Sequence, residues 1–224
     1  MEIQRVWAAY FSPTGTTEKI VTHLAEHLAK PIEHPVLYFD FTLPPARQEA
    51  KRFLKSDLVV FGVPVYAGRV PNVLLKYLNT LEGNGAQAVP VVLFGNRNYD
   101  EALKELRNLL ELRGFQTVAA GAFVGEHAFS YTLGKGRPDY ADLSVASAFA
   151  RRIFAVLRTG QVISPVRLDN EGPLGGYYQP RDQDGNPIDI RKVRPKTRDT
   201  CTDCGYCAQI CPMGSIDPAD VRNL

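Results

Sequence analysis

The sequence lacks any apolar run that approaches the length of about 20 residues needed to cross a membrane. Its first residues lead into a strand-like stretch and lack the profile of a signal peptide. It also lacks an excess of charge, because the formal net charge of its 224 residues is only +2. Such a balance favours neither nucleic acid nor an anionic membrane as a partner. We therefore expect a cytoplasmic protein with no membrane span.

Two common nucleotide-binding patterns are missing after the first apolar segment, which covers 3–11. Neither G-x-x-x-x-G-K-S/T nor G-x-G-x-x-G follows it, which disfavours nucleoside triphosphates and dinucleotides. A turn of glycine and hydroxyl residues stands there instead, at 12–17, and a helical pattern follows at once. Backbone N–H groups at a helix start attract a phosphate, and hydroxyls add donors. The alternative is a turn that only caps the helix. The candidate phosphate ligands are Ser12, Thr14, Gly15, Thr16 and Thr17.

Cysteine is scarce, and all four cysteines lie within eleven residues: Cys201, Cys204, Cys207 and Cys211. With Pro212 they form the pattern C-x-x-C-x-x-C-x-x-x-C-P, which is typical of bacterial ferredoxins with a 4Fe-4S cluster. A structural zinc site more often pairs two C-x-x-C knuckles that are farther apart. Disulfides are disfavoured because this is not a small secreted chain.

The fourth cysteine raises a question of ligand supply. In two-cluster ferredoxins the fourth cysteine of each pattern ligates the other cluster. This sequence contains one cysteine pattern, and its last residue is Leu224. Three alternatives follow: a chain truncated before a second pattern, a single cluster completed by Cys211, or an incomplete and labile cluster. In each case we expect at most one cluster in this chain.

Apolar strands alternate with helical patterns along the first two thirds of the chain. The expected strands cover 3–11, 36–39, 57–65, 88–94 and 117–124, and the expected later helices cover 44–55, 73–81, 103–110 and a segment from about 140. This order predicts an α/β protein with a doubly wound, five-stranded parallel sheet. The loops at 64–71 and 95–100 leave the carboxyl ends of two strands and combine tyrosine with glycine and amides, which suits a flat ligand.

With these loops in place, residues 3–160 resemble the flavodoxin family, whose members bind the FMN phosphate after the first strand and the isoalloxazine between the loops after the third and fourth. Together with the cysteine pattern, the chain resembles the flavodoxin/4Fe-4S ferredoxin fusion proteins of anaerobic microbes, in which stretches such as PVYAGRVP and GNRNYDEAL recur. It departs from them in lacking strong acidity and a second cluster pattern. The ring-binding residues implied are Pro64, Val65, Tyr66, Ala67, Gly68, Gly95, Asn96, Arg97, Asn98 and Tyr99.

We expect three regions: a flavodoxin-like FMN domain at 1–160, a linker rich in proline and glycine at 161–198, and a ferredoxin-type segment at 199–224. The linker is either an ordered tether or flexible. Its end carries a basic cluster that is either a solvated face or a docking site for an acidic redox partner; its members are Arg191, Lys192, Arg194, Lys196 and Arg198. His127 is treated as an ordinary loop histidine outside the site.

The expected function is electron transfer between FMN, the cluster and an external redox partner protein, with no catalytic side chain. An electron carrier is favoured over a substrate-converting oxidoreductase. The main alternative is an NAD(P)H- or ferredoxin-dependent flavin reductase that acts on a quinone or another small acceptor. A third hypothesis is an interaction module that holds zinc and has no redox role.

Overall fold

A computed structural model describes residues 3–160, 163–189 and 195–222 of the chain. All strand pairs in its sheet are parallel, and the strand order is β2-β1-β3-β4-β5, with β6 also pairing with β4. This 2-1-3-4-5 order is the flavodoxin-like one, and its direction reverses at β1. The strands are β1 (Arg5–Tyr10), β2 (Val36–Asp40), β3 (Asp57–Pro64), β4 (Gln87–Phe94), β5 (Gln116–Thr117) and β6 (Gly121–Val124).

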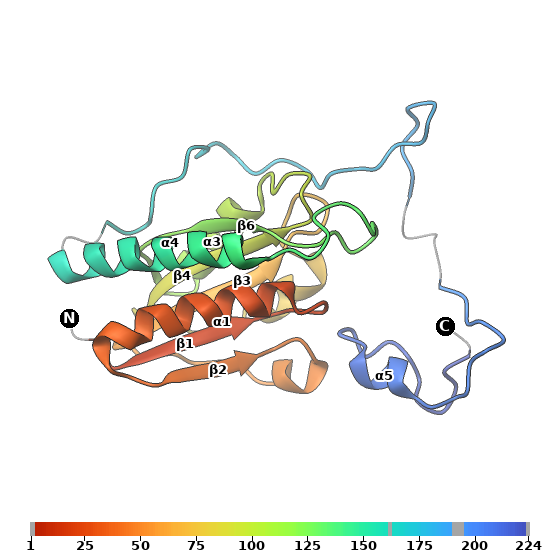
Figure 1. Cartoon of the computed structure of the whole chain (residues 1–224), viewed down its shortest axis with the longest axis horizontal. Coiled ribbons are helices and arrows are strands. Elements are labelled where there is room, and N and C mark those ends of the chain that lie inside the picture. Colours follow the sequence, from red (N-terminus) through yellow and green to blue (C-terminus); the bar gives the residue numbers. More distant parts are fainter. Residues whose placement is uncertain (1–2, 161–162, 190–194, 223–224) are drawn as a thin grey trace.

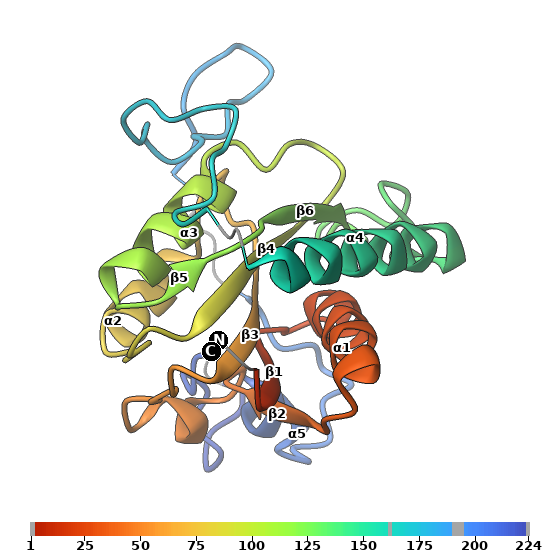
Figure 2. The ribbon, with the colours of Figure 1, turned by 90° about the vertical axis from the view of Figure 1, so that its left-hand side faces the viewer.

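Helices cover both faces of the sheet, as Figure 2 shows. The α-helices are α1 (Thr16–Ala29), α2 (Leu75–Leu78), α3 (Ala102–Leu112), α4 (Tyr140–Thr159) and α5 (Tyr206–Ile210), and the 3-10 helices are η1 (Lys30–Ile32), η2 (Pro44–Arg47) and η3 (Asn72–Leu74). Helices α1 and α4 pack on one face through an apolar cluster, and α2 and α3 pack on the other. The doubly wound α/β fold is thus confirmed. Among the described residues, no helix is both long and apolar enough for a membrane span.

The expected fifth strand is divided into β5 and β6. Ala88 of β4 pairs with Thr117 of β5, and Val91 of β4 pairs with Gly121 of β6. An advance of three residues along β4 is therefore matched by an advance of four residues along the segment that holds β5 and β6. One extra residue therefore breaks the ladder, as in a bulge. The two short strands together occupy the place of the single strand that the sequence predicts.

The expected helix at 44–55 is wrong beyond its first turn, because only η2 forms there. The chain then becomes extended, and the backbone N–H of Phe53 donates to the carbonyl of Glu82 at 2.9 Å. Phe53 is fully buried against Trp7 and Phe115. Burial of this aromatic ring outweighs the local preference of the segment for a helix. The expected helix at 73–81 is likewise reduced to η3 and α2.

The segment after α4 returns across α3, as Figure 1 shows. Lys104 of α3 donates to the carbonyl of Gly172 at 2.9 Å, and Arg107 forms an ion pair with Glu171 at 2.5 Å. We call the described residues 163–182 the strap. Its contacts favour the ordered-tether alternative for these residues. We call the described residues 199–222 the cysteine segment. This segment, with its helix α5, lies beside η2 (Figure 1).

Candidate functional site

The turn after β1 presents free donors at the start of α1. Gly15 has φ of 81°, a backbone conformation that favours glycine, and as the N-cap residue of α1 it offers no side chain to the helix N–H groups. Ser12 Oγ accepts a hydrogen bond from the N–H of Glu18 at 3.0 Å. Within the described ranges, the N–H groups of Thr16 and Thr17 have no protein acceptor. The turn therefore has the donor set that a phosphate group needs.

The close packing of α1 on the sheet positions this turn. A Cβ atom at Gly62 of β3 would lie 2.2 Å from Val21 and 3.0 Å from Thr17, so glycine at this position lets the helix approach the strand. The Thr17 side chain is buried, whereas Thr14 and Gly15 are exposed. The predicted residues at 12–17 thus lie on a supported turn with an open outer side.

The loop after β3 is a tight hairpin turn. Tyr66 and Arg69 exchange two backbone hydrogen bonds, at 3.0 and 3.1 Å, around Ala67 and Gly68, whose φ angles are 50° and 76°. The carbonyl of Gly68 accepts a hydrogen bond from the N–H of Glu101 at 2.9 Å. The structure therefore joins the predicted loop after β3 to the loop after β4.

The loop after β4 is held by side-chain contacts of its own. Arg97 and Asp100 form an ion pair, and Asn98 accepts a hydrogen bond from the N–H of Asp100 at 3.0 Å. The Tyr99 ring packs on Phe94 with a centroid distance of 5.5 Å. Tyr99 is 37% exposed, and Tyr66 on the neighbouring loop is 42% exposed. Both rings thus retain surface for a flat ligand.

The loop after β6 contacts both the turn after β1 and the end of β4. It was not predicted as part of the site. Gly125 donates to the carbonyl of Phe94 at 2.9 Å, and a Cβ on Gly125 would lie 3.2 Å from Thr16. A Cβ on Gly95 would lie 2.6 Å from the His127 ring. The indication in the sequence was positional, because this loop also leaves the carboxyl end of an expected strand.

Two tyrosines of the strap also reach the predicted loops. The N–H of Tyr178 donates to the carbonyl of Ala67 at 2.7 Å, and the Arg97 guanidinium lies 4.3 Å from the Tyr178 ring centroid. The Tyr177 hydroxyl donates to the carbonyl of Val70 at 3.2 Å. Both tyrosines fall within the linker that the sequence predicts at 161–198, and no local pattern indicates where a linker folds back.

The four cysteines are free thiols, so none forms a disulfide. Burial disfavours the Cys211 thiolate, but hydrogen bonds from Ser215 and from the backbone of Met213 and Gly214 outweigh it and lower the pKa of Cys211 to about 7. Cys204 also has a lowered pKa, chiefly because it accepts a hydrogen bond from the backbone of Tyr206. Such hydrogen bonds suit thiolates that ligate iron.

The structure does not gather these thiols into one cage. In the part of the chain that it describes, no three His, Cys, Asp or Glu side chains converge on a metal position. The loop that carries the first thiols is nevertheless held in place, since Arg222 donates to Asp203 at 2.8 Å and to the carbonyl of Cys201 at 2.6 Å. The donor types and the supported loop fit a 4Fe-4S cluster. Binding of the cluster would bring the four thiols together.

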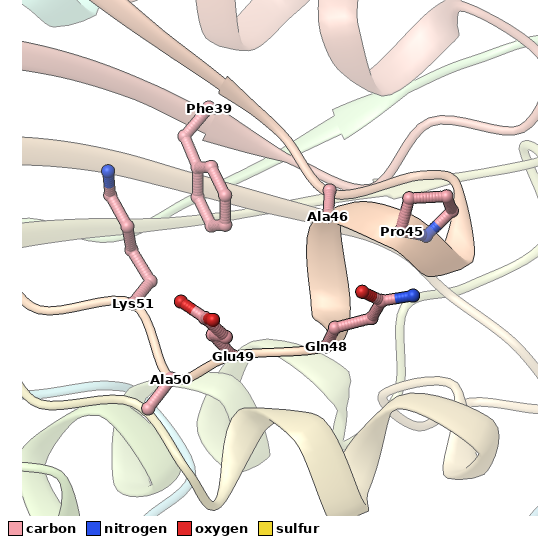
Figure 3. A pocket seen from close by; sticks show the side chains of 7 residues that line it. All are labelled: Phe39, Pro45, Ala46, Gln48, Glu49, Ala50 and Lys51. Carbon is pink, nitrogen blue, oxygen red and sulfur yellow. The ribbon is translucent and has the colours of Figure 1, made fainter.

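Two surface hollows lie away from the predicted loops. The smaller, of about 380 Å³, opens between β2 and the segment after η2, and Figure 3 shows Phe39 and Lys51 on one side of it and Pro45 and Ala46 on the other. The larger, of about 940 Å³, lies between α3 and the strap. Neither is lined by a predicted flavin-binding residue. The strand-end loops, with their free backbone donors, remain the better site for a phosphorylated ligand.

Comparisons with known proteins match both parts of the chain. Residues 6–130 match the family described as NADPH-dependent FMN reductase, and residues 195–217 match the 4Fe-4S binding domain. No curated protein matches the chain significantly.

Solved structures of similar fold include flavodoxins and one larger oxidoreductase. The flavodoxin of Streptococcus pneumonia TIGR4 is 19% identical with a TM-score of 0.47, and the match covers 67% of this chain and 97% of that one. Flavodoxin 2 from Bacillus cereus is 19% identical with a TM-score of 0.49, covering 67% and 97%. Rubredoxin oxygen:oxidoreductase from Desulfovibrio gigas is 20% identical with a TM-score of 0.49, covering 70% and 37%.

Proposed function

The chain belongs to the family of NADPH-dependent FMN reductases, and we propose that it relays electrons between FMN, a 4Fe-4S cluster and an external redox partner protein. The two family matches support the two cofactors, and hence a flavin and iron-sulfur redox protein. When bound, FMN exchanges one or two electrons and the cluster exchanges one. The polypeptide itself binds, orients and shields these groups.

The roles of the chain follow from the loops at the strand ends. The N–H groups of Thr16 and Thr17 would hold the FMN phosphate. Tyr66 and Tyr99 would contact the isoalloxazine ring. The other residues predicted at 64–68 and 95–99 would supply backbone and amide groups to the ring edge. We assign the FMN domain to 1–160 and the cluster segment to 199–224.

One observation carries the relay proposal: the cysteine segment contacts the carboxyl-end side of the same sheet that bears the flavin loops. The carbonyl of Pro212, next to Cys211, accepts a hydrogen bond from Arg47 of η2. Thr42, between β2 and η2, accepts a hydrogen bond from the N–H of Ser12 at 2.8 Å. These contacts support an internal relay, because they link the turn proposed for the FMN phosphate to the segment proposed for the cluster.

The external partner of the relay would be an acidic redox protein. Lys196 and Arg198 are exposed, while Arg191, Lys192 and Arg194 lie outside the described residues. Basic groups near the cluster would steer such a partner to it.

Anaerobically purified protein tests the proposal. We expect FMN and iron in the preparation. After reduction with dithionite and removal of the excess reductant, we expect an added oxidised acidic ferredoxin to take electrons from the cluster, and the cluster to take electrons from the flavin. Absorbance at flavin and cluster wavelengths follows both steps. Bound cofactors that never exchange electrons would contradict the relay.

The second candidate function is direct reduction of a quinone or another small acceptor by the flavin. The family itself favours it, and the exposed faces of Tyr66 and Tyr99 leave the loops accessible. Consumption of NADPH or NADH with a quinone and without any added protein would support this enzyme function. The relay predicts no such consumption.

A further inference from the structure

Arg47 donates hydrogen bonds to two segments that are far apart in the sequence. Its Nη1 donates to the carbonyls of Phe41 and Thr42, both at 2.6 Å, and its Nη2 donates to the carbonyl of Pro212. Its guanidinium also lies 5.6 Å from the centroid of the Phe11 ring. One side chain thus joins the loop after β2, the end of β1 and the cysteine segment.

The partners of Arg47 are unusual for a partly buried cation. Among the described residues, no carboxylate forms an ion pair with it, and burial lowers its pKa. Its charge is therefore compensated mainly by carbonyl dipoles, one of which belongs to the cysteine segment. If that segment moved away, Nη2 would exchange its carbonyl acceptor for water, and hydrogen bonds from charged groups contribute more to stability than neutral ones. The arrangement of charge thus favours the docked segment.

A second contact supports the same interface from the other side. Gly214 has φ of 59°, and a Cβ on it would lie 3.1 Å from Cγ of Pro44 in η2. Glycine is favoured here both by its backbone angle and by the closeness of the proline. The cysteine segment and η2 are therefore shaped to fit each other.

The same contacts reach the candidate phosphate turn. The N–H of Ser12 donates to Oγ1 of Thr42, the carbonyl of Thr42 accepts from Arg47, and Arg47 donates to Pro212 next to Cys211. Thr42 and Arg47 therefore link the candidate phosphate turn at 12–17 to Pro212, the residue that follows Cys211.

We propose that Arg47 is the positioning residue that docks the cluster segment against η2, beside the FMN phosphate turn. The functional role of this docking rests on the proposed relay, because docking would hold the two cofactors at a constant separation. Its physical basis is the set of hydrogen bonds and the contact between Gly214 and Pro44, which do not depend on which partner the protein serves.

Hydrogen-deuterium exchange of the purified holoprotein tests the docking. The variant Arg47→Met removes the donors but keeps much of the apolar stem. Arg52→Met is the matched control, because Arg52 is exposed and its one ion pair among the described residues is with Glu82, at 2.9 Å. In Arg47→Met we expect exchange in both 41–47 and 211–217 to be about tenfold faster or more, since hydrogen bonds to charged groups are among the stronger ones. The control should match the wild type in both segments.

The variant Gly214→Ala tests the interface without changing the flavin domain, so it remains informative if Arg47→Met fails to fold. We expect faster exchange in 41–47, although no residue there is altered; strain confined to the cysteine segment would leave 41–47 unchanged. Unaltered exchange in 41–47 in both variants would overturn the proposal. Flavin content, iron content and electron transfer to a ferredoxin, measured on the same samples, show separately whether the relay itself fails.

Discussion

Arg69 and Glu105 form a buried two-point ion pair that links the loop after β3 to α3. Nε and Nη2 of Arg69 donate to Oε2 and Oε1 of Glu105 at 2.8 and 2.6 Å, and the two side chains are only 12% and 6% exposed. Oε2 of Glu105 also accepts the N–H of Val70 at 2.8 Å. The hydrogen bonds to Glu105 raise the pKa of Arg69. This pair holds the start of α3 and the candidate flavin loop in one rigid unit.

Replacement of Glu105 with alanine leaves the Arg69 cation buried and without its partner. We expect the free energy of unfolding, measured with urea, to fall by about 3–5 kcal/mol. The control is Glu82→Ala, which breaks the exposed pair with Arg52 and should cost no more than about 1 kcal/mol. Equal costs for the two variants would contradict the structural role of the buried pair.

The double variant Thr14→Glu, Thr16→Glu should fold and lose FMN. Two carboxylates at the turn repel the phosphate, while negative charge at a helix start is favourable to the helix itself. Flavin retained after gel filtration gives the result. The control Thr22→Glu adds a negative charge to the same helix beyond its first turn and should keep its flavin. Normal flavin content in the double variant would show that the turn only caps the helix.

Alanine in place of Tyr66 or Tyr99 should weaken FMN binding, most strongly at the tyrosine that stacks on the ring. Loss of one aromatic contact costs about 0.5–1.5 kcal/mol beyond the lost area, or up to about tenfold in Kd. Titration of apoprotein with FMN, followed by flavin fluorescence, measures it. Tyr38→Ala in β2 serves as control. If neither loop variant changes the affinity or the flavin spectrum, the loops are wrongly assigned.

The chain should bind no more than about four irons per molecule, the content of one cubane cluster. We expect Cys211→Ala to lose iron, because the hydrogen bonds around Cys211 support a ligand thiolate in this segment. Iron and sulfide analysis after anaerobic purification decides it. Eight irons per chain, or a stable four-iron cluster without the Cys211 thiol, would show that other thiolates do the binding.

Acid should release the strap from α3. The hydrogen bonds from Arg107, then that from the N–H of Leu168, lower the pKa of Glu171 from 4.5 to about 2. A lowered folded-state pKa means that the pair stabilises the strap above about pH 4.5 and loses this effect as pH falls towards 2. Hydrogen exchange at 166–175 should therefore be faster in Glu171→Gln than in wild type at pH 6, and the difference should vanish towards pH 2. A difference that stays constant with pH would contradict the role of this carboxylate.

Local elements could be predicted from the sequence wherever their chemistry lies in neighbouring residues. Alternating apolar strands and helical patterns defined the α/β class, the turn at 12–17 indicated a phosphate site, and four cysteines within eleven residues indicated the cluster. Helix α4 begins where the sequence predicts it, because Asp139 and Asp142 form a capping box there. The failed helix at 44–55 shows the limit, since burial of Phe53 in the tertiary core decided that segment.

The contacts between distant loops and segments could not be predicted from the sequence. Arg47 and Pro212 are 165 positions apart, and no periodicity or spacing in the sequence relates them. The same holds for Tyr178 on Ala67 and for Gly125 against Thr16. Contacts of this kind depend on strand order, on the path of the strap and on close packing over the carboxyl ends of the strands. Local residue preferences carry no information on these, because many chain paths satisfy the same local patterns and only the packed core selects one.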